Sequence, residues 1–146
     1  MSRMVHVATE GVRIPVARTR VASLAERVLR AERVRDATVS VAFVTDRRIA
    51  ALNRQHLGHA GPTDVISFGF DPVGRSDEIV GDVYIAPGVA RRNARAHGRR
   101  VREELLRLVV HGVLHVVGHD HPEDESRYHS RMWKRQERLL RTLGAA

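Results

Sequence analysis

The stretch that decides the fold is His111-Gly112-Val113-Leu114-His115-Val116-Val117-Gly118-His119-Asp120-His121. Residues 105–117 are almost unbroken apolar sequence, and a helix that is apolar on nearly all sides is a buried central helix. His111 and His115 are four residues apart, so they project from the same face of that helix. Gly118 is placed to end the helix with a left-handed cap, and His121 follows three residues later. This spacing predicts a metal site of three histidines with a fourth position open to water, which is the arrangement of a catalytic zinc ion rather than a structural one.

The same histidines could instead be core residues bonded to carbonyl groups, but two imidazoles one turn apart would then both need buried partners. His121 is the third ligand in our interpretation, and His119 is the alternative, although it requires a tighter turn. Asp120 is the candidate catalytic carboxylate. We favour a role in which it orients a ligand histidine or caps the final helix over a role as the base.

The pattern H-x-x-x-H-x-x-G-x-x-H is shared with metzincin proteases, which carry a glutamate just after the first histidine as general base. Here that position is Gly112, so a protease of this type would lack its proton-transfer group. A glycine allows another backbone or a substrate to approach closely beside His111. Zinc held by three neutral imidazoles lowers the pKa of bound water to about 7 and polarises a carbonyl or phosphoryl oxygen, and both roles imply hydrolysis.

Composition limits the class of protein. The 146 residues suffice for one domain, expected to span residues 1–146, with a sound hydrophobic core. Because the chain has no cysteine, a metal must be bound by histidine and carboxylate. No run of about 18 apolar residues and no secretory signal occurs, so we expect a cytoplasmic protein that does not enter a membrane. A formal net charge of +8 favours a polyanionic partner, nucleic acid first.

Apolar periodicity predicts strands near residues 5–7, 39–44, 63–68 and 79–85, and helices over about 15–35, 46–52, 87–97, 101–117 and from Pro122 to about 144. Glycine and proline predict loops over 56–62 and 71–77. The result is an α+β fold: a small mixed β-sheet of about four strands packed with about five helices, with the metal site on the central buried helix. The first two strands, joined through a helix, should be parallel, and the last two should be antiparallel.

Basic residues gather just before the central helix. They are Arg91, Arg92, Arg95, His97, Arg99, Arg100 and Arg102, and of these we take Arg91, Arg92, Arg95, Arg99 and Arg100 as RNA-binding candidates. A surface that follows a phosphate backbone has this character. The final helix adds further basic residues, Arg127 among them, although glutamates at helical spacing pair with some of these. Aromatic residues for base stacking make up only 4% of the chain, so we expect weakly sequence-specific contacts with the nucleic-acid backbone.

Three motifs are more specific than the composition. They are His111-Gly112-x-Leu114-His115-x-x-Gly118-x-Asp120-His121, Pro62-Thr63-Asp64-Val65-Ile66-Ser67-Phe68 and Gly81-Asp82-Val83-Tyr84-Ile85. Together they resemble the YbeY family of bacterial single-strand endoribonucleases, from about the second strand to the end of the chain. The resemblance implies an α+β fold, one zinc-type ion per chain held by His111, His115 and His121, and a cleft bordered by residues 63–68.

The resemblance also implies a function. Members of the family are linked to trimming the 3′ end of small-subunit ribosomal RNA and to ribosome quality control. The expected partners are therefore ribosomal RNA and the pre-ribosomal small subunit, with ribosomal proteins or assembly GTPases as further candidates.

Two positions depart from the family pattern. The family commonly has an arginine, counted among its catalytic residues, five residues before the proline of its Pro-Thr-Asp/Asn-Val strand, and this chain has Leu57 there. A guanidinium could clamp a phosphate and a leucine cannot, so either the activity is reduced or Arg54, His56 or His59 substitutes for it. Arg54 and His59 are accordingly RNA-binding candidates. Position 119 is often aromatic in the family and is histidine here, which keeps the choice of third ligand open.

Three functions are compatible with these observations. The first is a metal-dependent endoribonuclease acting on ribosomal RNA, by attack of water or of the ribose 2′-hydroxyl on phosphorus. The second is a ribosome assembly factor that binds RNA and whose metal only stabilises the fold, and Leu57 favours this alternative. The third is a zinc peptidase or amidohydrolase, which would need a carboxylate base and a pocket not bordered by arginines.

Overall fold

The computed structural model describes residues 2–70, 78–121 and 125–144, and it contains a four-stranded mixed sheet in the order β1-β2-β4-β3. The strands are β1 (Arg3–Thr9), β2 (Ala37–Phe43), β3 (Val65–Phe70) and β4 (Ile79–Ile85). β1, β2 and β4 are parallel to one another, and β3 is antiparallel to β4 at one edge. The expected parallel first pair and antiparallel last pair are both confirmed.

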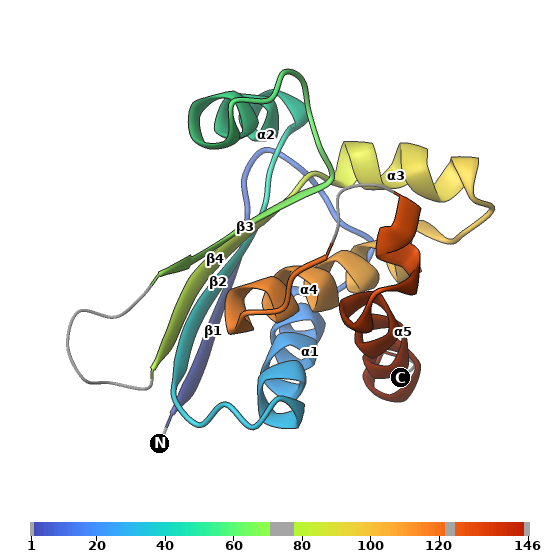
Figure 1. Ribbon diagram of the computed structural model, residues 1–146. Helices are drawn as coiled ribbons and strands as arrows, with labels where there is room; N and C mark the ends of the chain where they lie inside the picture. The colour runs from blue at the N-terminus through green and yellow to red at the C-terminus, as the bar shows by residue number, and fades with distance from the viewer. Residues whose placement is uncertain (1, 71–77, 122–124, 145–146) are drawn as a thin grey trace.

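Helices cover one face of this sheet (Figure 1). α1 (Arg18–Ala31) packs on β1, and α4 (Val101–Val117) lies across β3 and β4. α5 (Arg131–Leu143) packs against α4, while α2 (Asp46–Leu52) and α3 (Pro87–Ala96) lie at one end of the sheet. Strand residues and the buried faces of α1 and α4 form the main core, so the α+β class and the central place of the histidine helix are confirmed. Among the described residues, no helix combines the length and the apolar character needed to cross a membrane.

Two glycines allow α4 to lie close to the sheet. A Cβ atom on Gly112 would collide with the side chain of Val83 on β4, and one on Gly81 of β4 would collide with Val116 of α4. The side chain of Val83 on β4 therefore fits against Gly112 of α4, and the side chain of Val116 on α4 fits against Gly81 of β4, because neither glycine has a side chain. The space beside Gly112 is taken by the side chain of Val83, and not by the backbone or substrate that the sequence led us to expect. This contact positions the helix that carries the histidines on the sheet.

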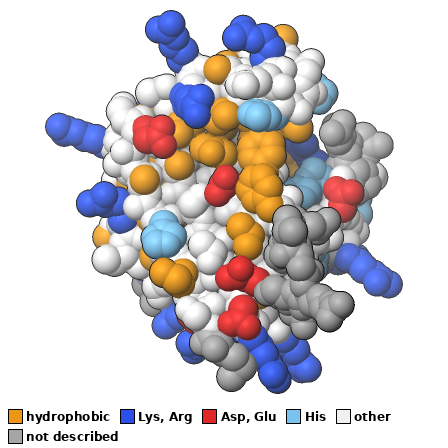
Figure 2. Space-filling model, turned by 90° about the vertical axis from the view of Figure 1, so that its left-hand side faces the viewer, with side chains coloured by type: hydrophobic (Ala, Val, Ile, Leu, Met, Phe, Trp, Pro, Cys, Tyr) orange, Lys and Arg blue, Asp and Glu red, His pale blue; other side chains and the backbone are white. Residues whose placement is uncertain are grey.

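The other face of the sheet is open over most of its length (Figures 1 and 2). α2 covers one end of it, where Ile49 and Leu52 pack with Ala42 and Ile66 in a second, smaller core. Hydrophobic side chains gather in the upper half of this face with some Asp and Glu side chains among and below them, and most Lys and Arg side chains lie at its margins (Figure 2). The open face is therefore not the basic surface for a polyanionic partner that the net charge of +8 favours.

Two predicted boundaries in the first half of the chain were wrong. α1 ends at Ala31 rather than near residue 35, because Arg33 adopts a left-handed conformation with a φ of 61°. Residues 56 and 57 do not belong to a loop but to η1 (Asn53–Leu57), a π-helical turn that continues α2. The loop begins at Gly58, whose φ of 70° ends this turn.

The inclusion of residues 125–130 in the final α-helix was also wrong. α5 begins at Arg131 because Ser130 caps it: the Ser130 hydroxyl accepts a hydrogen bond from the Trp133 N–H at 3.1 Å. A short 3-10 turn, η2 (Glu125–His129), precedes this cap. The predicted helix start at Pro122 and the predicted loop at 71–77 lie outside the described residues.

Candidate metal centre and cleft

The three predicted ligand histidines converge on one point. His111 and His115 lie one turn apart on α4, and His121 returns after Gly118, whose φ of 121° ends the helix. The ring centroids are 4.7 Å apart for His111 and His115, 5.0 Å for His111 and His121, and 4.9 Å for His115 and His121. One nitrogen of each ring lies within 4.8 Å of the nitrogens of the other two. This group could hold a metal ion.

His119 is turned away from this group. Its Nε2 contacts the carboxylate of Glu32 at the C-terminal end of α1. Arg135 of α5 donates to the other oxygen of the same carboxylate at 2.8 Å. The structure therefore places His121, and not His119, in the group of converging rings.

Burial keeps two imidazoles of this group uncharged at neutral pH. It lowers the pKa of His111 to about 4; a hydrogen bond with Gln136 opposes this shift only in part, and the neighbouring rings of His115 and His121 add to it. Burial, followed by the proximity of His121, also lowers the pKa of His115. Neutral imidazole is the form that binds a metal ion.

Gln136 on α5 sets the tautomer of His111. Its side chain is 1% exposed, and its Oε1 lies 2.7 Å from His111 Nδ1. Its Nε2 donates to Glu137 Oε2 at 3.0 Å, so Oε1 is the atom that faces the ring and accepts the Nδ1 proton. The lone pair of His111 is then on Nε2, where a metal ion can use it.

An ion-pair network fixes the orientation of Gln136. Arg107 of α4, whose side chain is 7% exposed, donates to Glu137 at 3.0 and 3.1 Å and to Glu103 at 3.0 Å. Burial raises the pKa of Glu137, but hydrogen bonds from Arg107 and Gln136 outweigh this effect and hold the pKa below its ordinary value. Glu137 is thus a charged acceptor that orients the Gln136 amide and, through it, the His111 ring.

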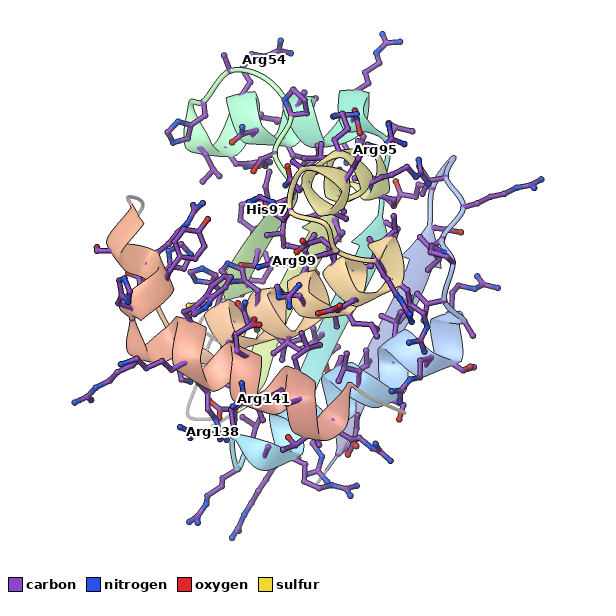
Figure 3. All side chains as sticks on the ribbon, turned by 90° about the vertical axis from the view of Figure 1, so that its right-hand side faces the viewer. Arg54, Arg95, His97, Arg99, Arg138 and Arg141 are labelled. Atoms are coloured by element: carbon purple, nitrogen blue, oxygen red, sulfur yellow. The ribbon has the colours of Figure 1, made fainter. Side chains whose placement is uncertain are left out.

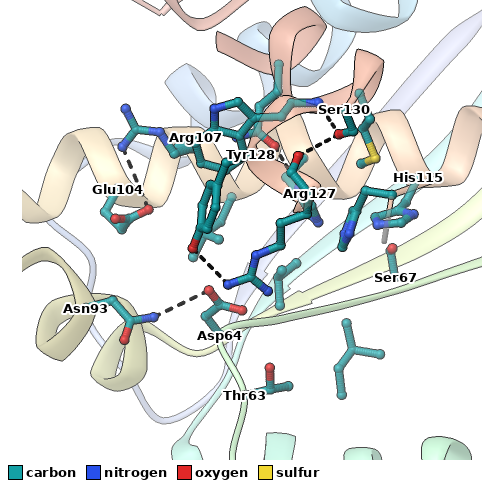
Figure 4. A pocket seen from close by; sticks show the side chains of 18 of the residues that line it. Thr63, Asp64, Ser67, Asn93, Glu104, Arg107, His115, Arg127, Tyr128 and Ser130 are labelled. Atoms are coloured by element: carbon teal, nitrogen blue, oxygen red, sulfur yellow. Dashed lines mark hydrogen bonds and ion pairs between the residues drawn. The ribbon is translucent and has the colours of Figure 1, made fainter. Parts of the chain in front are cut away.

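The histidines lie in a cleft of about 1100 Å³ (Figure 4). One wall is formed by β3 and the loop before it, with the side chains of Thr63, Asp64 and Ser67. The other wall is formed by η2 and the start of α5 and includes Arg127 and Tyr128. The expected cleft beside residues 63–68 is therefore present, and it joins segments far apart in the sequence.

Asp64 is a carboxyl group held in the cleft wall. Burial raises its pKa, and hydrogen bonds from backbone N–H groups together with the charge of Arg127 oppose part of that shift. Asn93 of α3 donates to Asp64 Oδ2 at 3.4 Å. Asp64 therefore retains its proton to a higher pH than a solvent-exposed aspartate does.

Asp120, the predicted catalytic carboxylate, lines the cleft beside the histidines. Its Oδ1 accepts the backbone N–H of His121 at 2.8 Å, and its charge raises the pKa of His115. Both contacts suit the favoured role, in which Asp120 orients a ligand histidine.

The RNA-binding candidates are divided between the cleft and the outer surface. His59 and Arg99 line the cleft. The remaining candidates lie outside its lining: Arg54, Arg91, Arg92, Arg95 and Arg100. Figure 3 shows Arg54 and Arg95 near α2 and α3, at a distance from the α5 residues Arg138 and Arg141. Contact of any of these residues with RNA stays a prediction.

Two residues of the site were not singled out from the sequence. Gln136 did carry a signal, because it lies four residues after Met132 and three before Leu139 and is therefore a polar residue within an apolar stripe. Arg127 carried no such signal. From the sequence it was one of several basic residues of the final helix, but that helix begins only at Arg131.

The fold and the site together define a class of protein: a small α+β protein with a three-histidine candidate metal centre in a cleft beside one edge of a mixed sheet. The sequence model of the family described as endoribonuclease YbeY matches residues 6–144. The chain belongs to the YbeY family.

Individual relatives agree with this assignment. The endoribonuclease YbeY of Frankia alni is 38% identical over 97% of this chain and 83% of its own length, and that of Pelotomaculum thermopropionicum is 41% identical over 82% and 81%. The solution structure of TM1509 from Thermotoga maritima is similar with a TM-score of 0.61 and 28% identity, covering 96% of this chain and 89% of that one. The resemblance carried by the sequence motifs is confirmed.

Proposed function

We propose that this protein is a zinc-dependent endoribonuclease that cleaves single-stranded RNA. The observation that carries the proposal is the group of three histidines, His111, His115 and His121, within a cleft. The relatives named endoribonuclease support the reaction, and the net charge of +8 supports a polyanionic substrate.

Zinc suits this set of donors. Three neutral nitrogen ligands leave the ion its full charge. Nitrogens bound to one tetrahedral zinc ion at about 2.1 Å are about 3.4 Å apart. The three ring nitrogens, all within 4.8 Å of one another, are the atoms that would hold such an ion. When bound there, the ion would act as a Lewis acid toward a phosphoryl oxygen and lower the pKa of a coordinated water molecule.

The protein's own groups orient the ligands and the substrate. Gln136 holds the His111 ring, and Asp120 holds the backbone of His121, so two of the three ligands are positioned before a metal ion binds. The hydroxyl groups of Thr63 and Ser67 line the opposite wall, where they can donate hydrogen bonds to phosphate or sugar oxygens.

Family resemblance supports ribosomal RNA as the substrate. In this proposal the protein trims the 3′ end of small-subunit ribosomal RNA and takes part in ribosome quality control in the cytoplasm. Its partners are the pre-ribosomal small subunit with ribosomal proteins or assembly GTPases. A single domain over residues 1–146 carries the activity, and the family match over residues 6–144 supports this.

Cleavage of a labelled single-stranded RNA tests the proposal. The zinc-loaded protein should cleave the single strand, and a chelator should stop the reaction. His115→Ala should abolish cleavage, whereas His6→Ala, which removes an exposed histidine of β1, should not. A 5′-phosphate on the product would indicate attack by water, and a 2′,3′-cyclic phosphate attack by the ribose hydroxyl. Full activity of His115→Ala would contradict the metal mechanism.

A second candidate function is favoured by Leu57, which is 50% exposed and lines the cleft with an apolar side chain. The protein would then be an RNA-binding ribosome assembly factor whose metal only stabilises the fold. This alternative predicts that a chelator melts the protein, that no cleavage is seen, and that the intact protein still binds RNA.

A further inference from the structure

Three arginines line the cleft within the described part of the chain, and two of them are neutralised by carboxylates. Arg99 lies 3.5 Å from Glu104, and Arg107 lies 3.0 Å from Glu137. Arg127 differs, since it forms no ion pair within 4.0 Å among the side chains that the structure describes. Of the three, Arg127 has the charge that is available to an anion in the cleft.

An aromatic pair holds Arg127 in place. Arg127 Nη2 donates to the Tyr128 hydroxyl at 2.9 Å, and the guanidinium carbon lies 4.9 Å from the centre of the Tyr128 ring. Tyr128 meets Trp133 of α5 edge to face, with 4.8 Å between the ring centres. Because Tyr128 is a neutral partner, Arg127 is oriented while it keeps its positive charge.

The guanidinium of Arg127 extends across the cleft toward the wall that carries Asp64 (Figure 4). Its charge acts on both sides of the cleft, since it lowers the pKa of Asp64 and that of His111. The side chain is exposed, so a ligand that enters the cleft can reach it. Leu57, which also lines the cleft, offers no charge at all.

We propose that Arg127, oriented by Tyr128, binds a phosphate group of the RNA strand next to the three histidines. This inference rests on the proposed function, because it takes single-stranded RNA as the ligand. A planar guanidinium forms two parallel hydrogen bonds with a phosphate group, whereas a lysine acts only as a point charge. Asp64 competes weakly for the guanidinium, since no ion pair within 4.0 Å joins the two residues.

Binding of a 2′-O-methylated, fluorescein-labelled oligouridylate tests this proposal, with the full-length protein as purified and a gel to show that the probe stays intact. Arg127→Ala should weaken binding about tenfold, the effect of losing one charge-assisted hydrogen-bond pair at an exposed site. It should also reduce the slope of log affinity against log salt by about 0.7, the value for one lost contact with a single strand. Arg127→Lys should keep the salt slope and restore part of the affinity.

Arg138→Ala is the matched control, because it removes the same charge from an exposed position of α5 that does not line the cleft. It should change the affinity by less than about twofold, because Arg138 does not line the cleft and a solvent-exposed charge that does not contact the ligand is screened by salt. Tyr128→Phe should weaken binding while leaving the salt slope unchanged, because it removes the hydroxyl that orients Arg127 and no charge.

Equal effects of Arg127→Ala and Arg138→Ala on affinity and salt slope would overturn the proposal. Cleavage assays separate this failure from failure of the proposed function. If the wild type cleaves RNA and Arg127→Ala leaves KM unchanged, the inference about Arg127 is wrong and the function stands. If the wild type binds the probe through Arg127 but cleaves no RNA, the proposed function is wrong and the inference about Arg127 stands.

Discussion

Replacement of Gln136 by leucine should weaken zinc binding without unfolding the protein. The Gln136 side chain is 1% exposed, and its Oε1 accepts the His111 Nδ1 proton at 2.7 Å. Leucine has nearly the same volume and no acceptor, so the buried Nδ1–H of His111 would be left unpaired. Glu137 would lose one hydrogen bond but keep those from Arg107, and it would stay satisfied.

The magnitude follows from the one group that is left unpaired. An unsatisfied buried donor costs about 1–3 kcal/mol of folding free energy. Loss of the partner that orients a ligand histidine typically weakens metal binding roughly 10- to 100-fold. Gln136→Glu should behave differently, because a carboxylate accepts the Nδ1 proton more strongly and preserves zinc affinity. It should instead lower stability, because it places a second carboxylate beside Glu137.

Competition against a chromophoric chelator measures the zinc affinity, and urea unfolding measures the stability. Gln55→Leu serves as the control, because it makes the same change at an exposed position of η1. Zinc affinity of Gln136→Leu equal to that of Gln55→Leu would refute the claim that Gln136 orients a ligand. Unchanged stability of Gln136→Leu would in addition show that the Nδ1 proton of His111 is not left buried and unpaired in this variant.

Three further changes test the packing and the charges around the site. Gly112→Ala should destabilise the protein by about 1–3 kcal/mol in urea unfolding, because the new methyl group collides with Val83, and Val83→Ala in the same chain should recover part of the loss. The raised pKa of Asp64 means that its carboxyl group keeps its proton to a higher pH in the folded state than in the unfolded state. Its contribution to stability is therefore complete below the ordinary pKa of 3.8 and is lost as the pH rises through the folded-state value. Asp64→Asn should remove this pH dependence from urea unfolding, and an unchanged profile would contradict the assigned shift. Arg107→Met should cost about 1–3 kcal/mol, because the partly buried Glu137 loses its ion pair and keeps the hydrogen bond from Gln136, whereas a comparable loss in the exposed variant Arg102→Met would show that the network has no special role.

The sequence was most informative where structure depends on neighbours along the chain. The apolar run before Gly118 predicted α4 over residues 101–117, and Pro87 predicted the start of α3, because helix interiors and ends have local signals. The three converging histidines were predictable for the same reason, since His111 and His115 share one helix face and His121 follows after a single turn.

Features that depend on contacts between distant segments were not predictable. Nothing near His119 indicates that Glu32, at the end of α1, holds it away from the other rings. The approach of Arg127 to the wall that carries Asp64 depends on how α5 packs on α4, and that packing has no local signal. Gln136 is an intermediate case, because its place in an apolar stripe was visible but its partner was not.

The most direct test of the central claim is the zinc coordination in a crystal structure of the zinc-loaded protein. We expect one ion bound by a ring nitrogen from each of His111, His115 and His121, with solvent in the fourth position. A fourth protein ligand such as His119 or Asp120, or zinc bound elsewhere with the three rings apart, would contradict it.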